Sequence, residues 1–265
     1  MPDPKATDRR RRGVKMPGLR EVSLVLAYYD NADMLRSHVE VWRSYPQDLA
    51  ARVRVVLVDD GSPNHDAASV LHSCTLGEEA LSFLPLEMQV FRVIPNIPWN
   101  QDGARNLAMR HVTTEWAFLT DMDHVLPPGE AEKLLALDCR PKTYYMPNQL
   151  LTDGSSLGRP HPNSYLMRAL DFWSMGGYDE DFAGYYGSDG NFRRCAKGAG
   201  LIETPTKAFS TVVYRSHDIF DANTKDWGRK GSPFHAALNP ALRAKVTGGA
   251  YKASNPIRFA WQRVL

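Results

Sequence analysis

The sequence predicts an α/β fold, a single domain in which a mixed, mostly parallel sheet is flanked by helices. Two observations carry this prediction. Between residues 21 and 124, short apolar runs rich in β-branched residues alternate with amphipathic segments of helical period. A strand–helix–strand rhythm of this kind produces parallel strands with right-handed crossovers. In addition, 265 residues of ordinary composition, 43% hydrophobic and 23% charged, suit one large globular domain.

Strands and helices are expected to alternate through the first half of the chain. The strands are expected at residues 22–28, 53–58, 89–94 and 116–120, and the helices between them at 33–45, 66–74 and 102–111. Pro46 closes the first helix, and Asp102 is expected to cap the third.

The rhythm changes after residue 124. Strands are expected at residues 143–151 and 164–168 around a turn at 153–155, then an aromatic, glycine-rich stretch at 172–186, a helix at 189–197 and a last strand at 211–214. The remainder, residues 219–265, is expected to alternate loops with short helical pieces, because its prolines argue against one long helix.

Charge is concentrated at the beginning of the chain. Residues 1–20 carry seven Lys or Arg and two Asp, a net +5, so the rest carries −3 of the total of +2. We interpret residues 1–20 as a disordered basic tail, either solvated or in weak contact with an anionic membrane surface. A slightly negative body excludes nucleic acid as a partner. Three cysteines without a CxxC pair, and no signal-peptide or membrane-spanning pattern, predict a cytoplasmic protein.

The most informative segment is Trp116-Ala-Phe-Leu-Thr-Asp-Met-Asp-His124, an apolar run that ends in two aspartates. A buried strand does not end in two charges without cause. In an extended segment residues i and i+2 point to the same side. Asp121 and Asp123 should therefore present two carboxylates to one point, with His124 facing away. Such a pair suits Mn²⁺ or Mg²⁺ shared with substrate phosphates, and a solvated turn is the alternative.

Polar residues follow other predicted strands as well. Tyr28, Asp60 and Asn96 fall at carboxyl ends of strands, as Asp121 does. Parallel sheets bind their ligands beyond these ends, so the four residues are expected to line one crevice. Arg105, near the beginning of a helix that faces this crevice, suits a diphosphate. A surface arginine is the alternative.

Five segments together resemble the motifs of family 2-like inverting glycosyltransferases of the GT-A fold. They are residues 24–30, 56–62, 100–106 and 121–123, and residues 176–182 followed by 187–189. The resemblance covers roughly residues 21–220. It implies one GT-A domain at 21–265, divided into a nucleotide-binding half (21–123), an acceptor-binding half (124–220) and a C-terminal loop and helical segment (221–265).

The resemblance also implies a hexosyltransferase-type enzyme whose partners are a nucleotide-diphosphate sugar and a saccharide or other acceptor with a hydroxyl. The backbone of the first strand end and Asp60 would hold the base, with UDP our preferred nucleotide over GDP. The residues implied to contact substrates are Ala27, Tyr28, Asp30, Asp60, Asn96, Arg105, Asp121, Met122, Trp173 and Asp179. For Asp60 the alternative is a purely structural turn, and for Trp173 a core aromatic cluster.

A divalent cation would remove the repulsion between the carboxylates of this site and a diphosphate. A diphosphate beside Asp121 and Asp123 is repelled by about 4 kcal/mol per charge pair at 4 Å and an effective dielectric of 20. Mn²⁺ or Mg²⁺ removes that repulsion. Asp121 and Asp123 are the implied ligands, and His217, which directly follows the last strand, is the candidate third ligand and favours Mn²⁺.

An inverting transfer needs one base to accept the proton of the acceptor hydroxyl. The resemblance assigns this role to Asp189, which follows Ser188 where relatives more often carry an acidic residue. A helix cap is the alternative role. Lys225, Arg229 and Lys230 are interpreted as cations of a lid over the diphosphate, with a solvated loop as the alternative.

Two other functions stay open at this point. Residues 118–126 also fit the Asp-x-Asp signature of haloacid-dehalogenase-like phosphatases, with Asp121 as nucleophile. That signature belongs on the first strand of its fold, whereas about 95 residues of α/β pattern precede it here. A nucleotide- or glycan-binding relative that has lost catalysis is the non-enzymatic alternative, because Ser188 departs from the pattern.

Overall fold

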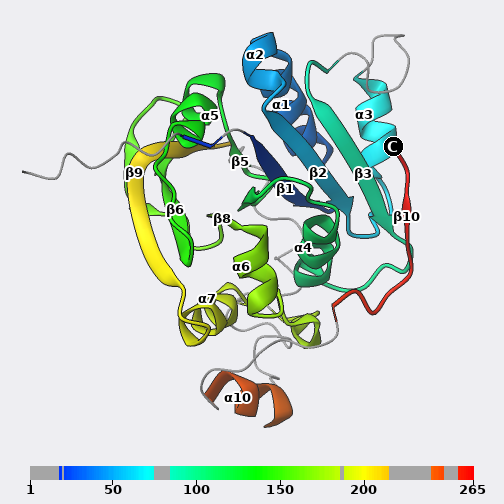
Figure 1. Ribbon diagram of the computed structural model, residues 1–265. Coiled ribbons are helices and arrows are strands. Elements are labelled where there is room, and N and C mark those ends of the chain that lie inside the picture. Colours follow the sequence, from blue (N-terminus) through cyan, green and yellow to red (C-terminus); the bar gives the residue numbers. More distant parts are fainter. Residues whose placement is uncertain (1–17, 20, 75–83, 186–187, 215–239, 248–255) are drawn as a thin grey trace, which may run out of the picture.

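The computed structural model describes residues 18–19, 21–74, 84–185, 188–214, 240–247 and 256–265 (Figure 1). Three predicted features lie outside these residues: the basic tail as far as residue 17, His217, and the proposed lid with Lys225, Arg229 and Lys230. None of the described helices is both long and apolar enough to cross a membrane.

One mixed sheet organises the described chain. Its strands are β1 (Val22–Tyr28), β2 (Val53–Asp59), β3 (Glu87–Val93), β4 (Trp116–Thr120), β5 (His124–Val125), β6 (Thr143–Leu150), β7 (Ser156–Pro160), β8 (Tyr165–Arg168), β9 (Ile202–Val213) and β10 (Trp261–Arg263). The order is β10-β3-β2-β1-β4-β8-β6-β9-β5, with β7 paired to β6. Strands β3, β2, β1 and β4 are mutually parallel, as predicted. The predicted mixed, mostly parallel α/β sheet is therefore confirmed for the first half of the chain.

Helices cover both faces of this sheet (Figure 1). They are α1 (Ala32–Arg43), α2 (Gln47–Ala50), α3 (Ala67–Ser73), α4 (Gln101–Arg110), α5 (Pro128–Leu135), α6 (Ala169–Ser174), the 3₁₀ helix η1 (Glu180–Phe182), α7 (Ser188–Gly198) and α10 (Pro240–Thr247). The buried residues of α1, α2, α3 and α5 share one apolar cluster, and those of α4, α6 and α7 share the other. Along β1, Leu24 and Leu26 face the first cluster and Val25 the second, because strand side chains alternate between faces.

The second half departs from the prediction in several places, including three strands. The last predicted strand covers only the end of β9, which begins nine residues earlier, at Ile202, in a stretch that is largely exposed. The edge strand β7 was not predicted, and its residues are almost all exposed. Strand β10 lies in the segment predicted as loop and helix and pairs antiparallel with β3. These strands form through pairing rather than through a local apolar pattern.

The beginning of α4 corrects one capping prediction. The N-cap residue is Asn100, and Asp102 is the second residue inside the helix. Asp102 is only 4% exposed. Its Oδ1 accepts a hydrogen bond from Ser188 Oγ of α7 at 2.8 Å. Asp102 therefore connects two distant helices instead of capping its own.

Candidate active site

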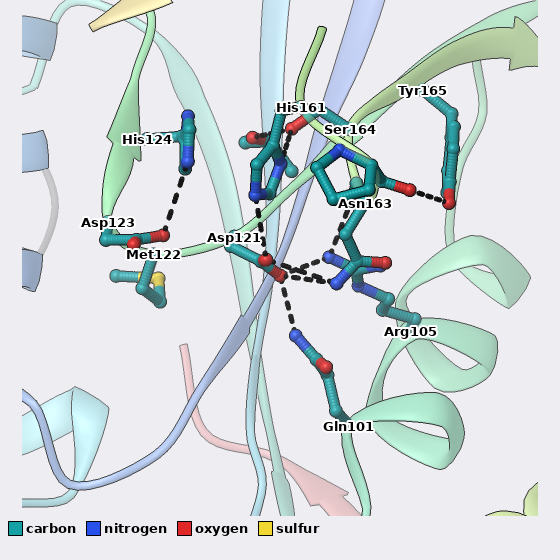
Figure 2. A network of polar contacts seen from close by, with 12 residues as sticks. Gln101, Arg105, Asp121, Met122, Asp123, His124, His161, Asn163, Ser164 and Tyr165 are labelled. Carbon is teal, nitrogen blue, oxygen red and sulfur yellow. Dashed lines mark hydrogen bonds and ion pairs between the residues drawn. The ribbon is translucent and has the colours of Figure 1, made fainter. Parts of the chain in front are cut away.

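Asp121, directly after β4, is the centre of a dense polar network (Figure 2). Its Oδ1 accepts from Arg105 Nη2 at 2.5 Å, from Gln101 Nε2 at 2.6 Å and from Asn163 Nδ2 at 3.0 Å. His161 Nε2 lies 3.7 Å from Oδ2. Three protein donors and one imidazole thus hold this carboxylate in a fixed position before any ligand arrives.

Arg105 is committed to this network. The residue is 0% exposed. Besides Asp121, its guanidinium donates to Tyr178 Oη at 2.7 Å and to Asn163 Oδ1 at 2.6 Å. A surface position is therefore wrong for Arg105. Arg105 was expected to be available for a diphosphate, but its positive charge is already paired with the Asp121 carboxylate.

The two aspartates do not aim at one point, because residues 121–123 form a turn and not an extended segment. The backbone N–H of His124 donates to the Asp121 carbonyl oxygen at 3.1 Å, and the two carboxylates diverge (Figure 2). Asp121 faces Arg105, whereas Asp123 faces His124, whose Nε2 lies 3.7 Å from Asp123 Oδ1. The expectation that His124 points away from the motif is wrong for the same reason.

A pair of histidines packs behind the motif. The rings of His124 and His161 lie 3.8 Å apart between centroids, tilted by 32°. Each Nδ1 meets a hydroxyl: His124 meets Thr211 Oγ1 at 2.9 Å, and His161 meets Ser164 Oγ at 2.8 Å. Each Nε2 lies near one carboxylate of the motif. This pair fixes the directions of Asp121 and Asp123 from the side of the second half.

A third histidine holds the middle of the motif from the other direction. His38 of α1 is completely buried, and its Nε2 donates to the Met122 carbonyl oxygen at 2.9 Å. Burial lowers the pKa of His38 to about 4, so the ring is neutral at pH 7. The Met122 side chain belongs to the apolar core. Only the backbone of this predicted substrate residue is therefore placed to face a ligand.

The expected base pocket is built around Asp60. Asp60 is 4% exposed, and its Oδ1 accepts from Asn100 Nδ2 at 2.9 Å. Burial raises its pKa well above the usual value. The neighbouring Asp59 has a structural role, since its two oxygens accept from the backbone N–H groups of Ser62 and Ala67 and thereby form the turn into α3. Of the two aspartates, Asp59 therefore holds the turn into α3, and Asp60 contacts the N-cap residue of α4.

The other residues predicted to line the common crevice differ in burial and in contacts. The Tyr28 side chain is buried in the core, with its hydroxyl donating to the His65 carbonyl oxygen, so only its backbone lies at the strand end. Ala27 is partly buried against the other cluster. Asn96 is exposed and exchanges hydrogen bonds with Tyr29 Oη. Asp30, in a left-handed conformation at φ 47°, accepts from the backbone of Asn64 and His65.

The predicted base lies at the first turn of α7. Burial raises the pKa of Asp189, and the charge of Asp121 raises it further, while Arg105 opposes both. Asp102 is fully buried, and burial raises its pKa to about 7. A carboxylate with a raised pKa is a stronger proton acceptor than one in water. The chemistry required of Asp189 is thus compatible with its surroundings.

The aromatic residues predicted near the acceptor belong largely to the core. Trp173 packs edge-on against Phe172, with centroids 4.9 Å apart, at the margin of the second apolar cluster. Asp179 has a side chain that is only 3% exposed; it caps η1 through the N–H of Asp181 and receives Lys245 Nζ at 2.7 Å. Both residues thus have structural contacts in the described chain.

Gly177 shows why the glycine-rich stretch approaches α4 so closely. Its φ is +73°, and an added Cβ would lie 2.6 Å from Asn106 Oδ1. Asn106 in turn accepts from the backbone N–H of Tyr178 at 2.8 Å and donates to Glu180 Oε1 at 2.9 Å. A side chain at position 177 would separate α4 from this stretch.

A divalent cation fits this site with substrate oxygens as further ligands. Among the described residues, no group of three or more His, Cys, Asp or Glu side chains is arranged to hold a metal. Asp123 supplies a hard carboxylate at the strand end, whereas Asp121 is already paired with Arg105. One or two carboxylates plus phosphate oxygens is the usual donor set for Mg²⁺-type ions. The predicted ligand His217 lies outside the described residues.

Sequence reasoning missed three residues of the network: Gln101, His161 and Asn163. Gln101 carried a signal, because it lies four residues before Arg105 and so shares its helix face. His161 and Asn163 lie in a short loop before β8, and no local pattern indicates that this strand runs antiparallel beside β4.

The chain belongs to glycosyl transferase family 2, whose family model matches residues 23–197. The matched range contains the Asp-Met-Asp turn, α4 and Asp189. The match is to a family of glycosyltransferases and gives no support to the phosphatase interpretation of residues 118–126. No curated protein matches the chain in sequence.

Solved structures agree on the fold. The mannosyltransferase PcManGT from Pyrobaculum calidifontis, in complex with GDP-Man and Mn²⁺, is 16% identical with a TM-score of 0.57 over 77% of this chain and 59% of its own. Residues 1–349 of TarS from S. aureus are 14% identical with a TM-score of 0.54, covering 73% and 60%. GalNAc-T7 with UDP, GalNAc and Mn²⁺ is 14% identical with a TM-score of 0.56, covering 75% and 45%. The single domain is thus GT-A-like, and the chain spans less than two thirds of the length of these structures.

Proposed function

We propose that this chain is a metal-dependent inverting glycosyltransferase that moves a sugar from a nucleotide-diphosphate donor to an acceptor hydroxyl. The observation that carries the proposal is the meeting of three elements at one end of the parallel strands: the Asp-Met-Asp turn after β4, the N-terminus of α4 and the first turn of α7. Gln101 connects the first two, at 2.6 Å from Asp121, and Ser188 connects the last two, at 2.8 Å from Asp102.

Asp189 is the proposed base. Its carboxylate would accept the proton of the acceptor hydroxyl while that oxygen forms a bond to the anomeric carbon, and the bond from this carbon to the diphosphate oxygen breaks on the opposite side. The raised pKa of Asp189 makes it a stronger proton acceptor. The nucleotide diphosphate leaves with the bonding electron pair.

A cation, proposed as Mn²⁺ or Mg²⁺, would supply charge neutralisation for the departing diphosphate. Asp123 is the protein carboxylate best placed to hold it, with Asp121 beside it and His217 as a further candidate. Mn²⁺ is supported by two similar structures that contain it, PcManGT with GDP-Man and GalNAc-T7 with UDP. Those two complexes contain different nucleotides, and the Asp60 carboxylate can accept either the imide N–H of uracil or two N–H groups of guanine. UDP is the nucleotide we propose first, with GDP as the alternative.

Thermal shift with UDP, GDP, CDP and TDP, each with and without Mn²⁺, tests donor binding. The stabilisation follows RT ln(1 + [L]/Kd), so the nucleotide that binds best raises the melting temperature most. We expect the rise to require Mn²⁺ and to disappear in Asp123→Asn. Absence of stabilisation by any of the four nucleotides would contradict the proposal.

Removal of the base tests the chemical step. Asp189→Asn is expected to keep donor affinity and to reduce nucleotide release from the sugar nucleotide at least ~100-fold. Asp48→Asn, on the exposed side of α2, is the matched control and should leave the rate unchanged. An unchanged rate in Asp189→Asn would remove Asp189 as the base.

A further inference from the structure

Helix α4 presents two pairs of side chains to two different parts of the site. Gln101 and Arg105, four residues apart, both donate to Asp121 Oδ1. Asp102 and Asn106, also four residues apart, both reach the second half of the chain: Asp102 contacts Ser188, and Asn106 contacts the stretch at Tyr178 and Glu180. Residues four apart share a helix face, so one rigid helix contacts the Asp-Met-Asp turn with one face and the acceptor-side elements with the next.

The surroundings of Asp102 disfavour the ionised form of its carboxyl. It is buried, and Asp189 of α7, Asp179 before η1 and Arg105 of its own helix lie near enough to influence its charge, the two aspartates unfavourably. The charge of Asp102 likewise helps to raise the pKa of Asp60, which follows β2. The ionised form of Asp102 is favoured by the hydrogen bond from Ser188 and by the charge of Arg105. Strained electrostatics of this kind concentrate at functional sites.

We propose that Asp102 positions the catalytic base: by accepting the hydrogen bond from Ser188, it fixes the first turn of α7 and so holds Asp189 in register with the donor side of α4. This inference rests on the proposed function. The buried carboxyl of α4 thus determines where the base lies relative to Asp121, although it does not itself touch substrate. Ser188 transmits the position, since it directly precedes Asp189 in the chain.

The test compares Asp102→Ala, Asp102→Asn and Ser188→Ala in the full chain, with release of UDP from UDP-glucose and of GDP from GDP-mannose in Mn²⁺ as the probes. Asp102→Ala and Ser188→Ala are expected to lower kcat at least ~10-fold while the Kd for the nucleotide diphosphate changes less than ~2-fold. Asp102→Asn should retain more activity than Asp102→Ala, because an amide oxygen still accepts from Ser188.

A double-mutant comparison separates positioning from general loss of structure. If Asp102 acts through Asp189, then adding Asp102→Ala to Asp189→Asn lowers the rate no further. The matched control is Asp171→Ala in α6, which removes another buried carboxylate, one that accepts from the backbone N–H of Lys142 at 2.9 Å. This control should lower the melting temperature without changing kcat of the folded protein.

The outcomes are distinct. Wild-type kcat in a folded Asp102→Ala or Ser188→Ala variant, or additive losses in the double mutant, would overturn the inference and leave the proposed function intact. Should Asp102→Ala fail to fold, Ser188→Ala decides, since it removes only a hydroxyl. If the unmodified chain neither binds a nucleotide diphosphate nor releases one from a sugar nucleotide, the proposed function fails, and the positioning role fails with it.

Discussion

The two halves of the chain are built in different ways. In the first half, four parallel strands and α4 place buried polar groups against each other, as Arg105 and Asp121 do with side chains 1% and 21% exposed. In the second half, η1 is joined to the C-terminal segments by more exposed pairs, such as Lys245 with Asp181 and Arg258 with Asp181. The comparison teaches that the network around Asp121 is fixed by the core, whereas η1 is held to the C-terminal segments by ion pairs nearer the surface.

Helix α4 contacts both the core of the first half and η1 of the second half. It packs on β1 and β2 through its apolar face, and it contacts η1 through Asn106 and Glu180 at 2.9 Å. Glu180 also accepts from the backbone N–H groups of Ile257 and Arg258. The C-terminal segment therefore binds η1 through Glu180 before it pairs with β3 as β10.

The largest effect is expected from breaking the buried pair. Arg105→Ala leaves the Asp121 carboxylate without its cation and Tyr178 and Asn163 without their shared donor, so we expect a loss of about 3–5 kcal/mol in the free energy of unfolding. Chemical denaturation of the two proteins measures this difference. Arg193→Ala in α7 is the matched control, since its bidentate pair with Glu203 lies at 34% and 36% exposure and should lose about 1 kcal/mol or less. Equal losses would contradict the contrast between the halves.

The pH dependence of stability sharpens the comparison in the first half of the chain. His38 has a folded pKa of about 4 against 6.5 for an ordinary histidine, because burial penalises its charged form. Its contribution to stability is therefore complete above pH 6.5 and is lost as the pH falls toward 4. The integrated difference is on the order of 3 kcal/mol.

We expect His38→Gln, which can still donate to the Met122 carbonyl, to reduce the loss of stability between pH 7 and pH 4.5. Unfolding free energies of both proteins at the two pH values measure the effect. Only the difference between the proteins is informative, because buried carboxyls such as Asp102, with its pKa raised to about 7, change stability in the opposite direction over this range. His72, on α3, supplies the matched control as His72→Gln. A parallel pH response of His38→Gln and the unmodified chain would refute the assignment.

The same contrast explains what the sequence could predict. The core strands of the first half were placed to within two residues because each carries its own apolar pattern. Strands β7 and β10 carry no such pattern and depend on partners distant in sequence. Site residues at strand ends, such as Asp60 and Asp121, followed from topology. His161 and Asn163 could not, because their position depends on β8 running beside β4, and the divergence of Asp121 and Asp123 depends on a turn that hydrogen bonding, not composition, determines.

The smallest effect is expected at the ion pairs between α10 and η1. Lys245 of α10, 33% exposed, bridges Asp179 and Asp181. Lys245→Ala should lower the free energy of unfolding by about 1 kcal/mol at low salt and by less in 1 M salt, because salt screens its pair with Asp181, whose side chain is 37% exposed. Arg36→Ala in α1 removes a pair of 48% and 73% exposure and should show almost no change at either salt concentration. A salt-independent loss in Lys245→Ala would mean that packing or the pair with Asp179, whose side chain is 3% exposed, attaches α10 to η1, and the second half would then resemble the first.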